Sequence, residues 1–326
     1  MKKSFEKICR MSQSNLKSYV ERRLQHTHKE ITVADGFVYA QGKFPVLLVA
    51  HLDTVHKALP NFILKAKDKD GNTVVSSPNG IGGDDRCGVY MIFEVLEKFN
   101  CSVLFCEDEE IGTVGAKKFT KHPLSKDLKF NYIIEFDRKG NNDAVFYDCD
   151  NEEFTEFITK EFFKEAYGSY SDISEVAPHL GCAAVNLSCG YYNAHTTNEY
   201  VVVEEMEKVI EETCKLLERT TDTDVYEYIE AKYYYRGSGG CYSYKDIYGD
   251  FGWYDEDYYS YGTYANEKKS QYYLITYNDP YVEDGADGWY ETEASSEAEA
   301  VGDFLMKFNW LCYNDIVEVL SEEDCM

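Results

Sequence analysis

Side chains able to bind a metal ion or move a proton stand at the ends of apolar segments in this sequence. The apolar run Val46–Ala50 is followed directly by His51-Leu52-Asp53. A continuous apolar run favours a strand buried on both faces, and open α/β sheets carry their chemistry at the carboxyl ends of such strands. We expect one of His51 and Asp53 to be a metal ligand and the other to orient it through a hydrogen bond.

Four further segments place a carboxylate or an imidazole just beyond an apolar segment. They are Gly80–Gly88, Cys106–Gly112, Glu135–Gly140 and Tyr192–Glu199. A single histidine after a strand is more often a turn residue than a ligand. The hypothesis of a metal site therefore depends on all five segments together.

Taken in order, the motifs resemble those of the co-catalytic di-zinc exopeptidases. This group includes the zinc aminopeptidases, the glutamyl-aminopeptidase-like enzymes, peptidase T and the carboxypeptidase G-like amidohydrolases. The matching motifs are His51-x-Asp53, Gly82-x-Asp84-Asp85-Arg86-x-Gly88, Glu109-Glu110-x-Gly112, Asp137 and His195-Thr196. The resemblance covers residues 30–220, approximately, and implies a hydrolase of amide bonds with two zinc ions as its cofactor.

Carried over motif by motif, the resemblance implies a set of metal ligands. Asp84 would bridge the two zinc ions, His51 and Asp137 would complete one site, and Glu110 and His195 would complete the other. Two imidazoles and three carboxylates suit zinc, and Co²⁺ or Mn²⁺ are possible substitutes.

The resemblance also implies that Asp53 orients His51 and that Glu109 is the general base, so these two are the candidate catalytic residues. Asp85 is expected to cap the helix that begins near Arg86. Arg86 is expected to anchor the acidic turn, and Arg138 with Lys139 either to receive a substrate carboxylate or to be solvated loop charges.

The spacing of the motifs limits the architecture. Only 57 residues separate Asp137 from His195, and only 32 separate His51 from Asp84. Neither interval has room for the lid, dimerisation or inserted domains of the larger relatives. A catalytic core without an inserted domain is expected, and the subfamily stays open.

Apolar periodicity predicts an α/β fold with a mainly parallel, doubly wound sheet and helices on both faces. A helix is predicted over 4–25, and the Asp35-Gly36 and Asp70-Gly71 turns between β-rich arms predict hairpins over 31–40 and 62–76. The alternating pattern then predicts strands 45–50, 102–106, 130–136 and 182–188 and helices 87–99, 113–121, 151–166 and 201–219.

The composition changes after residue 220. Residues 221–326 hold 24 acidic and 6 basic side chains, and 18 tyrosines lie between positions 226 and 290. We predict a catalytic domain over 1–220 and a small acidic, Tyr-rich α+β module over 221–326. Apolar segments at 272–277, 289–293 and 315–320 and a helical pattern over 296–308 favour α+β. This module is expected to modulate access or partner choice.

The charge of the sequence, its apolar stretches and its cysteines limit which partners and which cellular location are expected. A net charge of −26 repels nucleic-acid phosphates and anionic lipid. No stretch has the roughly 20 apolar residues of a membrane span, and the N-terminus lacks an apolar signal core. Eleven cysteines without CxxC spacing favour reduced thiols and a cytoplasmic location. Cys87, Cys106 and Cys189, beside the motifs, are expected to be packing residues.

The sequence therefore predicts a zinc-dependent hydrolase that cleaves amide or peptide bonds at a chain end, most simply an aminopeptidase. Two alternatives stay open. One is an amidohydrolase or deacylase of small N-acyl substrates. The other is an inactive metal-binding scaffold whose acidic tail recruits a partner. The intact Glu109 argues against the scaffold.

Overall fold

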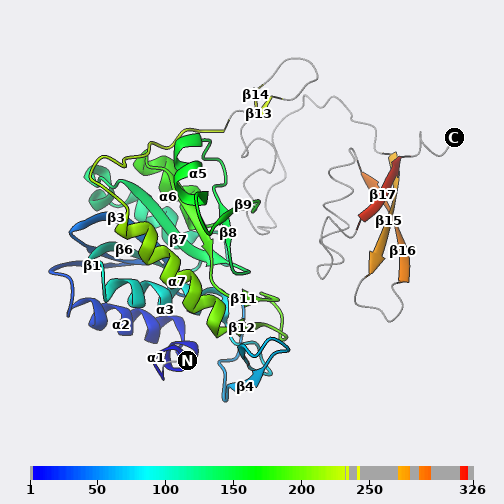
Figure 1. Cartoon of the computed structure of the whole chain (residues 1–326), viewed down its shortest axis with the longest axis horizontal. Coiled ribbons are helices and arrows are strands. Elements are labelled where there is room, and N and C mark those ends of the chain that lie inside the picture. The colour runs from blue at the N-terminus through cyan, green and yellow to red at the C-terminus, as the bar shows by residue number, and fades with distance from the viewer. Residues whose placement is uncertain are drawn as a thin grey trace, which may run out of the picture. The chain divides into compact units, whose positions relative to one another are not determined.

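The computed structural model describes residues 3–231 and, beyond them, the strands 233–234, 241–242, 271–279, 286–294 and 316–321. The contacts of the chain divide it into two units, Met1–Asp255 and Glu256–Met326. Figure 1 labels the elements of both units. No helix in the described ranges is long and apolar enough to cross a membrane.

The first unit is built on an eight-stranded sheet in the order β1-β2-β6-β3-β7-β10-β8-β9. Its four central strands, β6, β3, β7 and β10, are parallel, whereas β1, β2 and β8 join antiparallel. The strands are β1 (Glu30–Ala34), β2 (Phe37–Gln41), β3 (Phe44–His51), β6 (Cys101–Cys106), β7 (Tyr132–Arg138), β8 (Asp143–Val145), β9 (Lys164–Ala166) and β10 (Ala184–Ser188). The prediction of a mainly parallel core is confirmed.

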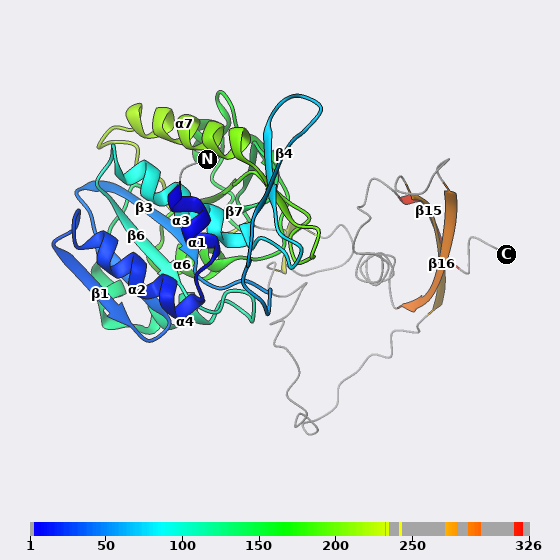
Figure 2. The same ribbon diagram turned by 90° about the horizontal axis from the view of Figure 1, so that it is seen from below.

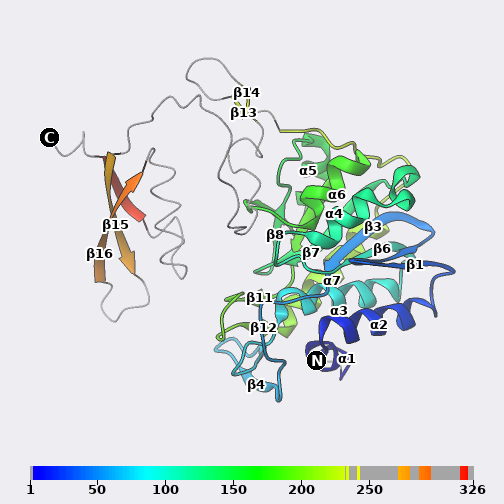
Figure 3. The ribbon, with the colours of Figure 1, turned by 180° about the vertical axis from the view of Figure 1, so that it is seen from behind.

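Helices cover both faces of this sheet, as Figure 3 shows from behind. Those described are α1 (Lys3–Cys9), α2 (Gln13–Leu24), α3 (Gly83–Leu96), α4 (Val114–Lys121), the 3₁₀ helix η1 (Pro123–Asp127), α5 (Glu152–Thr159), α6 (Asp172–Leu180) and α7 (Val203–Glu218). The larger hydrophobic core contains side chains of α1, α2, α3 and α7, and the smaller core contains those of α4 and α6.

The apolar run of β3 is continuous because the strand is buried on both faces. Val46, Leu48 and Ala50 belong to the larger core, whereas Leu47 and Val49 belong to the smaller one. Successive side chains of a strand point to opposite faces, so both faces need apolar residues when helices cover each of them.

A second, four-stranded sheet has the order β11-β12-β5-β4 and is antiparallel throughout. Its strands are β4 (Leu64–Lys67), β5 (Thr73–Ser76), β11 (Tyr191–Tyr192) and β12 (Tyr200–Val202). The β4–β5 hairpin, predicted from its Asp-Gly turn, extends away from the main body (Figure 2). The hairpin of β11 and β12 brackets His195.

Two helix predictions are wrong. The helix expected over 4–25 is divided into α1 and α2, because Ser12 has an extended backbone and its side chain caps α2 by accepting from the Asn15 N–H. The helix expected over 151–166 ends at Thr159, and Lys164–Ala166 instead pairs with β8 as β9. Helix α6, which contains Pro178, was not predicted.

Residues 221–231 continue along the first unit. The Ala183 N–H donates to Tyr226 O at 2.9 Å, the Tyr226 N–H donates to Asn131 O at 2.8 Å, and the Tyr226 ring packs on Phe154. The predicted division after residue 220 remains a prediction, but contacts with the elements that precede it reach at least Ala231, whose N–H donates to Asp148 O at 2.8 Å.

The second unit contains β15 (Gln271–Asp279) between β16 (Ala286–Ala294) and β17 (Ile316–Ser321), all antiparallel. These strands overlap the three apolar segments at 272–277, 289–293 and 315–320 that the sequence predicted. The helical pattern over 296–308 lies outside the described residues. A two-stranded pair, β13 (Tyr233–Tyr234) and β14 (Cys241–Tyr242), precedes this unit.

Candidate metal centre

The candidate ligands come together where the central strands end. His51 ends β3, Asp137 lies near the end of β7, and Glu110 follows β6. Asp84 lies in the first turn of α3, where its backbone is not helical. His195 comes from the β11–β12 hairpin and has a φ of 64°, a left-handed conformation that is costly for a non-glycine residue and is concentrated at functional sites.

The five side chains lie within hydrogen-bonding distance of one another in two groups that share Asp84. His51 Nε2 is 3.0 Å from Asp84 Oδ1 and 3.5 Å from Asp137 Oδ1. His195 Nε2 is 3.2 Å from Asp84 Oδ2 and 3.1 Å from Glu110 Oε2. Each oxygen of Asp84 therefore faces one imidazole, as a bridging carboxylate would.

Asp53 accepts three hydrogen bonds and connects two loops. Its Oδ1 is 3.1 Å from His51 Nδ1 and accepts from the Glu109 N–H at 3.0 Å, and its Oδ2 accepts from the Glu110 N–H at 3.1 Å. The hydrogen bond to Nδ1 leaves Nε2 of His51 facing Asp84 and Asp137. Asp53 therefore holds both the imidazole and the turn that carries Glu109 and Glu110.

The side chains of Asp85 and Arg86 form hydrogen bonds with backbone groups around the candidate ligands. Asp85 accepts from the Gly88 N–H at 2.8 Å, a helix cap, and from the His51 N–H at 3.2 Å. The guanidinium of Arg86 is buried and donates to the backbone carbonyls of Leu52 and Asp53. These two hydrogen bonds support the loop that follows β3.

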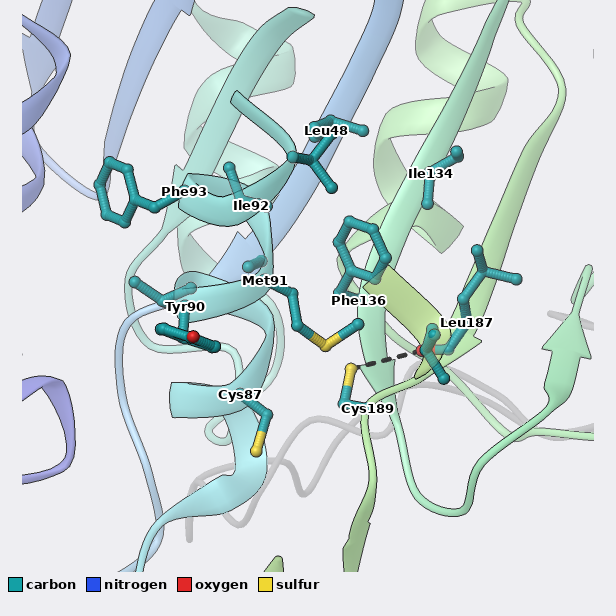
Figure 4. Close-up of a cluster of buried hydrophobic side chains, with 14 of the residues drawn as sticks. Leu48, Cys87, Tyr90, Met91, Ile92, Phe93, Ile134, Phe136, Leu187 and Cys189 are labelled. Atoms are coloured by element: carbon teal, nitrogen blue, oxygen red, sulfur yellow. Dashed lines mark hydrogen bonds between the residues drawn. The ribbon is translucent and has the colours of Figure 1, made fainter. Parts of the chain in front are cut away.

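Helix α3 is held close to the sheet, which keeps Asp84 at the sheet edge. In Figure 4, Met91 of α3 points toward Phe136 of β7, and Cys189, whose Sγ donates to Leu187 O at 3.4 Å, lies beside them. A Cβ at Gly88 would lie 2.1 Å from Phe136 O, so only glycine permits this approach. Cys87, Cys106 and Cys189 are buried packing residues, as predicted.

The charges of the cluster favour a bound cation. Burial disfavours the charged form of His51, yet Asp137 and Asp53 raise the pKa of this imidazole well above its usual value. Hydrogen bonds to Asp84 and Glu110 raise the pKa of His195 to about 11. The carboxylates around these two imidazoles therefore form a region of excess negative charge. A divalent ion bound there would balance that charge.

Further observations test whether the residues fit a metal. Oε1 of Glu110 is buried and has no hydrogen-bond partner in the described part of the chain. Two triplets have ligand atoms within 4.8 Å of one another: His51, Glu109 and Asp137, and His51, Asp84 and Glu110. Imidazole and carboxylate are the ligands of catalytic zinc, so the donor set fits.

Burial raises the pKa of the Glu109 carboxyl well above its usual range, and Asp137 and Asp172 raise it further. Asp172, at the start of α6, is fully buried. Glu135, in β7, is also buried. Burial raises the pKa of its carboxyl well above the usual range, and the nearby charges of Asp137 and Asp172 raise it further. Sequence reasoning missed Glu135 and Asp172 as parts of this acidic cluster.

Sequence reasoning also missed Glu199. Its buried carboxylate accepts from the Gly82 N–H at 2.6 Å and the Asp84 N–H at 3.0 Å, and it lies 2.8 Å from His56 Nε2. Glu199 thus joins the hairpin that carries His195 to the loop that carries Asp84. Its position four residues after His195 was the available signal.

Other charged and imidazole side chains have partners outside the ligand cluster. Arg138 Nε donates to Asp143 Oδ2 at 3.1 Å. His28 Nε2 is 2.8 Å from Cys101 O, and His179 Nε2 is 2.9 Å from Ser125 Oγ.

Comparisons with known proteins show a partial family match and a shared fold. Residues 38–180 match the model of peptidase family M28. No curated protein matches the sequence significantly. Among solved structures, aminopeptidase PepT from Bacillus cereus ATCC 10987 has a TM-score of 0.52 at 15% identity, with 66% of this chain and 96% of that chain covered.

A tripeptidase from Staphylococcus aureus subsp. aureus Mu50 also has a TM-score of 0.52, at 12% identity, with 65% of this chain and 95% of that chain covered. At such identities the two structures establish a shared fold, while the family match covers the segment with four of the five candidate ligands. The match to peptidase family M28 and the shared fold are consistent with a metallohydrolase of the co-catalytic zinc exopeptidase type.

Proposed function

We propose that the protein is an aminopeptidase whose active site holds two zinc ions. The observation that supports this most directly is the position of Asp84, with one oxygen 3.0 Å from His51 Nε2 and the other 3.2 Å from His195 Nε2. His51 and Asp137 would bind one ion with Asp84, and Glu110 and His195 would bind the other. Bound zinc would polarise the scissile carbonyl and stabilise the charge that develops on its oxygen.

Glu109 is proposed as the general base. Its carboxylate belongs to the same cluster of potential ligand atoms as His51 and Asp137, and its backbone N–H is fixed by Asp53. In this position it would take a proton from the attacking water and pass it to the leaving amine. The raised pKa of Glu109 would fall when positive charge is bound nearby, which would return the carboxyl to the form that accepts a proton.

We further propose a peptide substrate and a reducing compartment such as the cytoplasm. The eight cysteines whose side chains are described are unpaired and buried, which is typical of chains that are not stabilised by disulfides. The net charge of −26 disfavours nucleic acid and anionic membrane surfaces as partners.

A substrate panel with the zinc-loaded full chain tests the proposal. Peptides with a free α-amine, the same peptides acetylated at the N-terminus, and N-acyl amino acids are compared, with a chelator-treated sample as control. An aminopeptidase cleaves only the first set, and zinc restores the activity lost to the chelator. Cleavage of N-acyl amino acids would indicate an amidohydrolase, and silence on every substrate at full zinc occupancy would indicate an inactive scaffold.

A further inference from the structure

Helix α2 and Met11, which lies just before it, precede the residues that match family M28, yet they contact the loops of the metal centre. Arg86, which supports the loop after β3, also donates from Nη2 to Met11 O at 3.1 Å. Helix α2 contacts the other loop, Glu107–Thr113, through the side chains of Gln13 and Lys17.

Gln13 and Asp108 are joined by two reciprocal hydrogen bonds. Gln13 Nε2 donates to Asp108 Oδ1 at 2.9 Å, and the Asp108 N–H donates to Gln13 Oε1 at 3.4 Å. Asp108 has a φ of 60°, in the left-handed region that side chains other than glycine, asparagine and aspartate rarely adopt. The residue that follows it is Glu109, so the direction in which the chain enters the Glu109–Glu110 turn depends on this conformation.

Lys17 holds the preceding residue. Its ammonium group donates to Glu107 Oε2 and to Ala34 O. The same oxygen of Glu107 accepts from the Gly36 N–H at 3.1 Å, which ties the loop to the β1–β2 hairpin. The side chains of Lys17 and Glu107 are only 18% and 15% exposed, so solvent screens this pair less than an ion pair on the surface.

We propose that Gln13 and Lys17 are positioning residues for the Glu109–Glu110 turn. The turn is held from one side by the carboxylate of Asp53, which accepts from both of its N–H groups. It is held from the other side by α2, through the residues that precede it. This inference rests on the proposed roles of Glu109 and Glu110, because it assigns the helix a part in placing these two carboxylates.

Steady-state kinetics of full-length, zinc-loaded variants test the proposed positioning role of α2. Gln13→Met keeps the length of the side chain and removes both hydrogen bonds, and Gln13→Glu adds repulsion between two carboxylates. We expect kcat to fall about two- to tenfold in Gln13→Met and further in Gln13→Glu, with KM little changed. Asp108→Asn should restore Gln13→Glu, because asparagine tolerates the left-handed region and its amide donates to the new carboxylate. The control is Arg22→Ala, an exposed position on the same helix.

Titration with Co²⁺, followed by its visible absorption, gives a second readout that needs no turnover. Gln13→Glu should weaken binding of the ion held by Glu110, and the added Asp108→Asn should recover it, at unchanged melting temperature. Unaltered kcat and Co²⁺ binding in Gln13→Glu, or failure of Asp108→Asn to rescue both, would overturn the assignment. A wild-type chain that cleaves nothing would refute the proposed function instead, and the Co²⁺ titration would still decide the role of Gln13.

Discussion

Replacement of Asp53 by asparagine isolates the role of a residue that binds no metal in our proposal. Asp53 is the only described carboxylate shown to accept from His51 Nδ1 and from the N–H groups of both Glu109 and Glu110. Asparagine retains the size and one acceptor oxygen. It replaces the second oxygen by an NH₂ group, which cannot accept from the N–H that it faces, and it removes the negative charge.

The size of the effect follows from these three contacts. At least one hydrogen bond to a charged acceptor is lost, and such bonds contribute about 1.5–3 kcal/mol each, equivalent to about 10- to 150-fold in affinity. Loss of a carboxylate that orients a ligating imidazole typically costs about 10–100-fold in metal affinity or activity. We therefore expect Asp53→Asn to weaken zinc binding by about 10–100-fold while the chain stays folded.

Competition with a chromophoric chelator measures this affinity. A matched control is Asp68→Asn, because Asp68 accepts from the N–H groups of Asp70 and Asn72 in the turn of the β4–β5 hairpin and should leave zinc affinity unchanged. The reasoning is refuted if Asp53→Asn binds zinc as tightly as the wild type, or if Asp68→Asn weakens binding equally.

Three other outcomes are expected. Asp84→Ala should lower zinc content toward zero by elemental analysis, whereas His195→Ala should lose mainly one ion; equal losses would exclude a bridging role. Glu109→Gln should retain both ions and lose about 10²–10⁴-fold in kcat; if it loses metal and Glu110→Gln keeps metal and activity, their roles are reversed. A chain ending after Ala231 should melt cooperatively, bind zinc and cleave a minimal substrate, since every proposed ligand precedes it; a folded, metal-loaded truncation without activity would place part of the active site in the tail.

The sequence alone predicted those elements whose form depends on residues that are neighbours along the chain. The continuous apolar run Val46–Ala50 predicted a strand with two buried faces, because successive side chains of a strand point to opposite faces and here all of them are apolar. The Asp35-Gly36 turn predicted the β1–β2 hairpin, and Gly36 has a φ of 91°. The order of the motifs also predicted His51 and His195 as ligands, and the structure places both within hydrogen-bonding distance of Asp84.

Elements whose form depends on distant partners were not predicted. The segment Lys164–Ala166 is a strand only because Asp143–Val145 lies beside it, and strand pairing of this kind overrides a local helical pattern. The break between α1 and α2 was assigned wrongly although its cause, the Ser12 cap, is local.

The geometry of the site also belongs to the tertiary structure. His195 reaches Asp84 because a second sheet pairs Tyr200–Val202 with Val74–Ser76, and Glu199 then connects the two loops through buried hydrogen bonds. Residue types and order along the chain determined which groups could bind a cation. Their separations of a few ångströms depend on packing between segments far apart in sequence, because short-range preferences carry no information about which remote segments will meet.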